Sequence, residues 1–186
     1  MITIRRARPM DAAAIGAVHV SAWRSAYAGI LPEAYLAGLS MPRQAAHYQA
    51  AIQAGTGVHV ATVSGLDLGP AGGHPRIVGF VTGGPAHRPH SFAEGEIETL
   101  YVLDDWRERG LGRRLMRASA AWLAASGCGS AFLWVLRDNP SRWFYERLGG
   151  KAVAEQTIRV AGRDVVQTAY VWAPIEKLAQ ATSSAS

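Results

Sequence analysis

The sequence has few of the residues that hold extracellular or membrane-spanning folds together. Its 186 residues include one cysteine, Cys128, so no disulfide can form within the chain. No stretch approaches the roughly 20 uninterrupted apolar residues of a membrane span, and the N-terminal residues turn polar at Pro9 without the apolar core of an export signal. Charged residues make up 18% and hydrophobic residues 49%, which excludes a disordered chain. We therefore expect a soluble, cytoplasmic protein with a single folded core.

Lysine is nearly absent as well, so arginine carries the positive charge. Only Lys151 and Lys177 are lysines, yet Lys and Arg outnumber Asp and Glu by 19 to 14, for a net charge of +5. This surplus favours an anionic partner such as nucleic acid, a membrane surface or a phosphorylated small molecule. Arginines and aromatic residues do not interleave as in proteins that bind single-stranded nucleic acid, so nucleic acid is not expected as a partner. A membrane partner is not expected either. His87 and His90 lack a third ligand at a suitable spacing, so no metal site is expected.

The pattern of apolar residues predicts strands in the middle of the chain with helices between them, the order of an α+β fold with a mixed sheet. Residues 64–75, rich in glycine and proline, are expected to form a loop, and the chain is expected to fray after Gln180. Alternating apolar residues predict strands over 2–6, 58–63, 77–82, 96–103, 130–136, 153–160 and 164–172. Helical periodicity and capping residues predict helices over 12–28, 33–39, 42–52, 110–126 and 140–148.

One segment joins a strand, a glycine-bearing turn and the start of a helix, which favours an anion site. Gly110 and Gly112 let a ligand approach the main-chain N–H groups of the first helical turn, where the helix dipole is positive. The turn lacks the Gly-Lys-[Ser/Thr] of a nucleotide P-loop and the third glycine of a dinucleotide site. Four arginines add positive charge around it: Arg107, Arg109, Arg113 and Arg114.

Two motifs resemble those of the GNAT superfamily of N-acetyltransferases. Arg107-x-x-Gly110-x-Gly112 follows a hydrophobic strand and is similar to the family signature Arg/Gln-x-x-Gly-x-Gly/Ala. Residues 139–150 are similar to the second family block, Asn…Phe-Tyr-Glu-x-Leu-Gly, and residues 20–32 resemble the N-terminal stretch of many bacterial members. The resemblance implies a single domain over residues 1–176 with a C-terminal tail over 177–186. It also implies a mixed central sheet, flanked by helices and splayed between its fourth and fifth strands.

The resemblance further implies acetyl-CoA as co-substrate, with the pantetheine arm between those two strands. Asn139 and Tyr145 are six residues apart instead of the usual seven, so Asn139 has two interpretations: a CoA contact or an N-cap before Pro140. The main chain of the fourth strand would bind the pantetheine arm at Leu100, Tyr101 and Val102. The CoA phosphates would be held at Arg107, Glu108, Arg109, Gly110, Leu111, Gly112 and Arg113.

The implied reaction moves an acetyl group directly from acetyl-CoA to a primary amine. The family tyrosine, here Tyr145, would donate a proton to the departing thiolate, and the N–H of Val102 would meet the oxyanion. Glu96 and Glu98 are the candidate bases that take the amine proton. Two residues apart on a strand, they are expected to face the same side as Leu100 and Val102.

The acceptor is expected to be a small-molecule or peptide amine. Trp23 and Tyr27 lie four residues apart on one helix face and are candidate substrate-binding residues, although packing would also explain them. An acidic run is expected to face a cationic acceptor. A regulatory module that binds acetyl-CoA without transfer is the alternative function, and a homodimer is left open. The acidic run consists of Glu94, Glu96, Glu98, Asp104 and Asp105.

Overall fold

The structure is a computed structural model that describes residues 1–65, 75–87 and 92–183. Most of the expected loop over residues 64–75, together with His90, lies outside the described residues. None of the helices within those three ranges is both long and apolar enough to cross a membrane.

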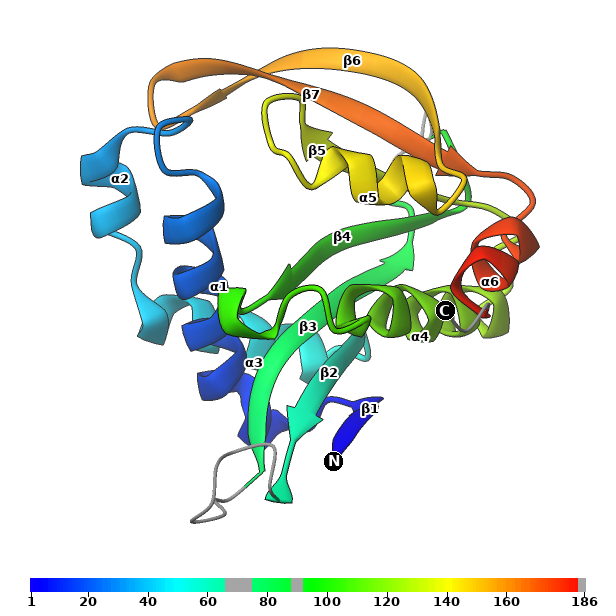
Figure 1. The fold of residues 1–186 in the computed structure, drawn as a ribbon, viewed down its shortest axis with the longest axis horizontal. Coiled ribbons are helices and arrows are strands. Elements are labelled where there is room, and N and C mark those ends of the chain that lie inside the picture. Colours follow the sequence, from blue (N-terminus) through cyan, green and yellow to red (C-terminus); the bar gives the residue numbers. More distant parts are fainter. Residues whose placement is uncertain (66–74, 88–91, 184–186) are drawn as a thin grey trace.

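A seven-stranded mixed sheet runs through the centre of the chain in the order β1-β2-β3-β4-β5-β7-β6 (Figure 1). All neighbouring strands are antiparallel except β4 and β5, which are parallel. The expected α+β fold with a mixed sheet is therefore confirmed. The strands are β1 (Ile2–Arg6), β2 (Gly57–Val63), β3 (Arg76–Pro85), β4 (Gly95–Val102), β5 (Ala131–Leu136), β6 (Lys151–Val160) and β7 (Arg163–Trp172).

Helices cover both faces of this sheet because each presents an apolar stripe to it. On one face, Ile15 of α1 and Tyr48 of α3 pack with Phe80 of β3. On the other face, α4 buries Leu115 and Leu123 in the main core. The helices are α1 (Ala12–Ala26), α2 (Glu33–Ala37), α3 (Met41–Gln53), α4 (Leu111–Ala125), α5 (Arg142–Arg147) and α6 (Glu176–Ser183).

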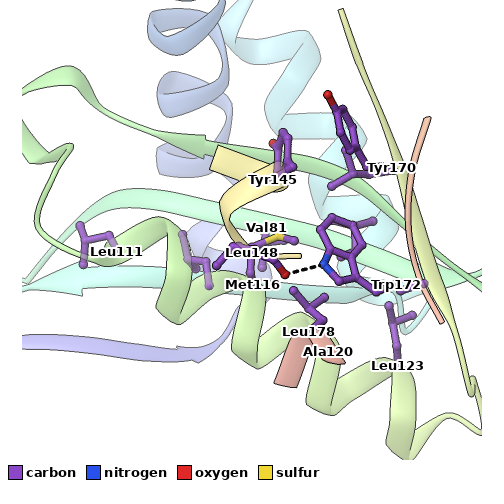
Figure 2. Close-up of a cluster of buried hydrophobic side chains, with 14 of the residues drawn as sticks. Val81, Leu111, Met116, Ala120, Leu123, Tyr145, Leu148, Tyr170, Trp172 and Leu178 are labelled. Carbon is purple, nitrogen blue, oxygen red and sulfur yellow. Dashed lines mark hydrogen bonds between the residues drawn. The ribbon is translucent and has the colours of Figure 1, made fainter. Parts of the chain in front are cut away.

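The main core joins α4, α5 and α6 to the far end of β7 (Figure 2). Trp172 of β7 is buried, and its indole N–H donates a hydrogen bond of 2.8 Å to the carbonyl of Leu148. Leu178 of α6 is fully buried against α4, and Thr182 is also buried. The expectation that the chain frays after Gln180 is therefore wrong as far as Ser183, because α6 contributes apolar side chains to the core.

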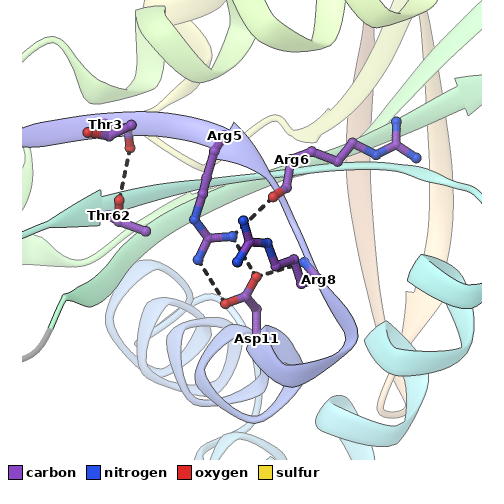
Figure 3. A network of polar contacts seen from close by, with 6 residues as sticks. All are labelled: Thr3, Arg5, Arg6, Arg8, Asp11 and Thr62. Atoms are coloured by element: carbon purple, nitrogen blue, oxygen red, sulfur yellow. Dashed lines mark hydrogen bonds and ion pairs between the residues drawn. The ribbon is translucent and has the colours of Figure 1, made fainter.

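An ion pair fixes the chain reversal between β1 and α1 (Figure 3). The guanidinium of Arg5 donates two hydrogen bonds, of 2.7 and 2.9 Å, to the carboxylate of Asp11. The same carboxylate accepts the main-chain N–H of Arg8 at 2.7 Å. The hydrogen bond from Arg5 is the main reason why the pKa of Asp11 is lowered, although burial opposes it.

The two parallel strands part soon after they meet. β4 and β5 pair only at Gly95 with Ala131 and at Glu96 with Phe132. From Ile97 onward, the main-chain groups on this edge of β4 have no partner in β5. The splay predicted between residues 96–103 and 130–136 is thus confirmed.

The hairpin of β6 and β7 arches over β5 and α5 and reaches the connection between α1 and α2 (Figure 1). There the guanidinium of Arg163 donates a hydrogen bond of 2.9 Å to the carbonyl of Ile30. Val160 and Val165 of the hairpin pack against the buried cluster of Tyr27, Leu31 and Leu36. The hairpin therefore joins the end of α1 across the opening between β4 and β5.

Candidate active site

A cavity of about 660 Å³ lies where β4 and β5 part. Its walls come from the C-terminal half of α1, from both strands, from the turn before α4, from α5 and from the β6–β7 hairpin. A volume of this size fits a small-molecule site. The cavity places the strand edge, the glycine turn and the second sequence motif on one surface.

Most of the predicted site residues line this cavity, although they are spread over more than 120 positions of the sequence. Glu96 and Arg109 are not among the lining residues. Glu96 lies at the last paired position of β4 and β5. The guanidinium of Arg109 lies 4.6 Å from the ring centre of Trp106. The predicted residues that do line the cavity are Trp23, Tyr27, Glu98, Leu100, Tyr101, Val102, Arg107, Glu108, Gly110, Leu111, Gly112, Arg113, Asn139 and Tyr145.

A β-bulge in β4 redirects Glu98. The neighbours Thr82 and Gly83 of β3 pair with Thr99 and Ile97, so Glu98 is the extra residue between them. The bulge reverses the alternation, and Ile97 therefore lies on the α4 side together with Leu100 and Val102. The expectation that Glu96 and Glu98 face the same side as Leu100 and Val102 is wrong for this reason.

Glu98 instead lies near the α1 and α3 side of the sheet, where its charge helps to raise the pKa of Tyr48. Burial is the larger cause of that shift. The Glu98 side chain is exposed within the cavity wall, so its carboxylate is accessible to a ligand. Its position at the start of the splay suits a group that receives a proton from an amine.

The turn before α4 has two residues with left-handed backbone. Gly110, the N-cap, has a φ of 73°, and Glu108 has a φ of 59°. A left-handed residue other than glycine costs about 1–2 kcal/mol, and such strain is concentrated at ligand sites. The N-cap Gly110 has no side chain that could cap α4, so the positive end of the helix dipole at this turn suits an anion.

The side chains around this turn are held by neighbours. Arg107 forms an ion pair of 2.9 Å with Asp104. Gly112 lies against α5, where a Cβ atom would be 3.2 Å from the ring of Phe144. Gly112 therefore has a packing role in addition to any close approach to a ligand.

Asn139 occupies the turn between β5 and α5. Its side-chain oxygen accepts the main-chain N–H of Ser141 at 2.9 Å. The N-cap of α5 is Ser141, so the interpretation of Asn139 as the N-cap is wrong by two residues, although Asn139 does stabilise this turn. Burial raises the pKa of Tyr27, and the neighbouring side chains of Asn139 and Tyr101 oppose that shift.

Tyr145 lies in α5 with its ring in the main core and part of its surface in the cavity wall. Its ring centre is 5.3 Å from that of Phe144 and 6.5 Å from that of Trp172. Burial, with a smaller contribution from Tyr27, raises the pKa of Tyr145 well above that of a free phenol. The hydroxyl is therefore protonated at neutral pH and can act as a donor.

Buried polar aromatic residues pack against Trp23 in the α1 wall of the cavity. His19 Nδ1 lies 2.7 Å from the hydroxyl of Tyr48, and its ring stacks on Trp23 with centres 5.2 Å apart. Burial is the main cause that lowers the pKa of His19 to about 4, so the imidazole is neutral at neutral pH. Sequence reasoning missed His19 and Tyr48, because they are 29 residues apart and neither belongs to a motif.

The acidic run does not form one face. The carboxylate of Glu94 accepts the main-chain N–H of Gly129, away from the cavity. Asp104 accepts the hydroxyl of Ser25 at 2.5 Å and pairs with Arg107. Of the five acidic residues, only Glu98 lines the cavity. The expectation of an acidic surface for a cationic acceptor is therefore wrong.

Comparisons with known proteins agree with this geometry. Residues 32–150 match the model of the acetyltransferase (GNAT) family. The chain is 29% identical over 178 residues to an uncharacterised N-acetyltransferase of Bacillus subtilis, YuaI, with 96% of each chain covered.

Solved structures share the fold. A GCN5-related N-acetyltransferase from Rhodopseudomonas palustris superimposes with a TM-score of 0.68 at 23% identity, over 92% of this chain and 94% of that one. YncA from Salmonella typhimurium, a putative acetyltransferase solved with acetyl-CoA, superimposes with a TM-score of 0.65 at 19% identity, over 92% and 93%.

Proposed function

Because this chain belongs to the GNAT family of acetyltransferases, we propose that it moves the acetyl group of acetyl-CoA directly to a primary amine. The observation that carries the proposal is the cavity that joins the open edge of β4, the N-terminal turn of α4 and the hydroxyl-bearing wall of α5. Each of these three features matches one part of the reaction: the thioester arm, the phosphates and the departing sulfur.

The residues present fit acetyl-CoA. Leu100 and Val102 turn their main-chain groups to the open edge of β4, whereas Tyr101 pairs with Phe80 in the hydrogen-bonded register that the bond from the Leu103 N–H to the Val78 carbonyl continues. The groups of Leu100 and Val102 suit the amide groups of a pantetheine arm, because an extended chain can pair with an open strand edge. The first turn of α4 suits the pyrophosphate, because its N–H groups and dipole attract negative charge. Arg107 and Arg113 add charge on the same wall.

The base in this proposal is Glu98. An alkylamine has a pKa of roughly 10.4, so it must lose a proton before its nitrogen can attack. Glu98 lines the cavity at the start of the splay, whereas Glu96 lies at the closed end outside the lining. The carboxylate of Glu98 takes this proton directly or through one water molecule.

The transfer then follows in one cavity. The amine nitrogen attacks the thioester carbonyl, a C–N bond forms, and the N–H of Val102 stabilises the oxyanion. The C–S bond breaks, and Tyr145 donates its proton to the sulfur. Because the phenol is weakly acidic, its hydrogen bond supports the developing thiolate before the proton moves. Solvent returns a proton to Tyr145, and Glu98 releases the amine proton.

The alternative is a module that binds acetyl-CoA and regulates another protein without transfer. Release of free CoA, measured with a thiol reagent in the presence of a panel of amines, separates the two functions. Transfer predicts saturable release that depends on both acetyl-CoA and the amine. Tight acetyl-CoA binding in calorimetry without release at any amine would favour the regulatory module.

A further inference from the structure

We infer that the acceptor is an amine with a single positive charge attached to an apolar group, and not a polycation such as a polyamine or an aminoglycoside. The inference rests on the proposed function, because it describes the second substrate of the same cavity.

The charges of the cavity wall limit how many ammonium groups the acceptor can have. Among the residues that the structure describes, Glu98 and Glu108 are the carboxylates in the lining. Glu108 belongs to the turn before α4, at the proposed phosphate end. The same wall contains Arg107, Arg113 and Arg147. One ammonium can therefore be matched by Glu98, whereas a second would find no further carboxylate in the lining away from the phosphate end.

The apolar side chains of the wall favour an apolar substituent on the acceptor. Trp23 and Tyr27 of α1 border the cavity with ring centres 4.8 Å apart. Leu31 follows in the connection to α2, and Ile158 and Val160 complete this side from the β6–β7 hairpin. An alkyl or aromatic substituent gains free energy when it leaves water for such a surface.

The charges and the apolar surface of the wall together define the acceptor class. Burying an ammonium without a partner is unfavourable, because the ion loses its hydration and gains no opposite charge. His19 behind the wall is neutral at neutral pH and supplies no charge of either sign. The cavity therefore selects against every additional positive charge on the acceptor, and in favour of apolar area next to a single amino group.

A matched pair of amines tests this selection: hexylamine and 1,6-diaminohexane have the same chain length and differ in the second ammonium. We expect kcat/KM for hexylamine to be at least tenfold higher, measured as CoA release at neutral pH; tenfold corresponds to about 1.4 kcal/mol. The diamine has a statistical advantage, because its two amino groups are equivalent. Equal kcat/KM values, or a preference for the diamine, would overturn the inference.

A variant with a new carboxylate provides the second measurement. Ile158→Glu adds a partner for the second ammonium, so the preference for hexylamine should fall at least threefold, because the second charge is then no longer buried without an opposite charge. Thr157→Glu places the same charge on the exposed neighbouring position of β6 and should leave the preference unchanged. An equal effect of both variants would contradict a role for the cavity wall.

The acceptor class and the transfer reaction are contradicted by different results. A preference for the diamine overturns the acceptor class while the transfer reaction stands. Absence of CoA release with every amine, while acetyl-CoA still binds, contradicts the proposed function itself and the inference with it. If Ile158→Glu does not fold, the ratio of the two amines in the wild-type protein still decides the acceptor class.

Discussion

Replacement of Tyr145 by phenylalanine removes one hydroxyl from the cavity wall and leaves the aromatic ring in the core. The contacts with Phe144 and Trp172, at 5.3 and 6.5 Å between ring centres, are kept. Loss of one buried hydroxyl changes the free energy of unfolding by about 1 kcal/mol, so the melting temperature should move by no more than about 4 °C.

The effect on catalysis should be much larger. A hydrogen bond to a charged group is worth about 1.5–3 kcal/mol, so loss of the donor to the developing thiolate should lower kcat roughly 10- to 100-fold. The assay is CoA release at saturating amine, together with calorimetric titration of acetyl-CoA, whose affinity should change less than about threefold. Because burial raises the pKa of Tyr145, the wild-type rate should show no alkaline loss from this residue below about pH 10.

Tyr170→Phe is the matched control for Tyr145→Phe. The hydroxyl of Tyr170 is bound to Glu146 at 2.6 Å and is not part of the cavity lining. Its removal should leave kcat within about twofold of wild type. A kcat of Tyr145→Phe equally close to wild type would refute the role of the hydroxyl in thiolate departure.

Three further predictions concern the base, the turn and the ion pair. Glu98→Gln should lower kcat by about 100-fold, as expected for loss of a general base, and Glu96→Gln should change kcat less than threefold. A larger loss of kcat in Glu96→Gln than in Glu98→Gln would reassign the base to Glu96. Gly110→Ala should lower the melting temperature by about 2–8 °C and weaken acetyl-CoA binding in calorimetry, because the N-cap is left-handed. The control is Gly84→Ala, at a glycine with space around it. Asp11→Asn should reduce the free energy of unfolding by about 1.5–3 kcal/mol at pH 7. The folded-state pKa of Asp11 is lowered, so its stabilisation exists above the unfolded pKa of about 3.9 and is lost as the pH falls. Urea unfolding at several pH values should therefore show the difference from wild type disappearing below about pH 4; a difference that is independent of pH would contradict the ion-pair explanation.

The sequence was sufficient for those parts of the fold that depend on local pattern. α4 was predicted from the apolar spacing of Leu111, Leu115 and Trp122, and the structure places it within one residue of the expected bounds at each end. The glycine turn before it was predicted as an anion site from two glycines and the neighbouring arginines. These features are local, because the backbone conformation of a turn and the periodicity of a helix depend on adjacent residues.

The features that the sequence did not predict depend on distant residues. The bulge at Glu98 exists because Thr82 and Gly83 pair with residues on either side of it, and strand register is not visible in one strand alone. The burial of Leu178 depends on α4, which lies more than 50 residues earlier in the chain. The contact of His19 with Tyr48 likewise depends on how α1 and α3 pack. The side on which a strand residue faces, and hence the choice of Glu98 over Glu96 as the proposed base, depends on the three-dimensional structure.

The fate of the acetyl group itself shows whether transfer is direct. Acetyl-CoA labelled with carbon-13 in the acetyl group is incubated with the protein and hexylamine, and both the amine product and the protein are analysed by mass spectrometry. Direct transfer predicts labelled N-hexylacetamide in an amount equal to the CoA released, with no label on the protein. Label retained on the protein, or CoA release without the labelled amide, would contradict direct transfer to the amine.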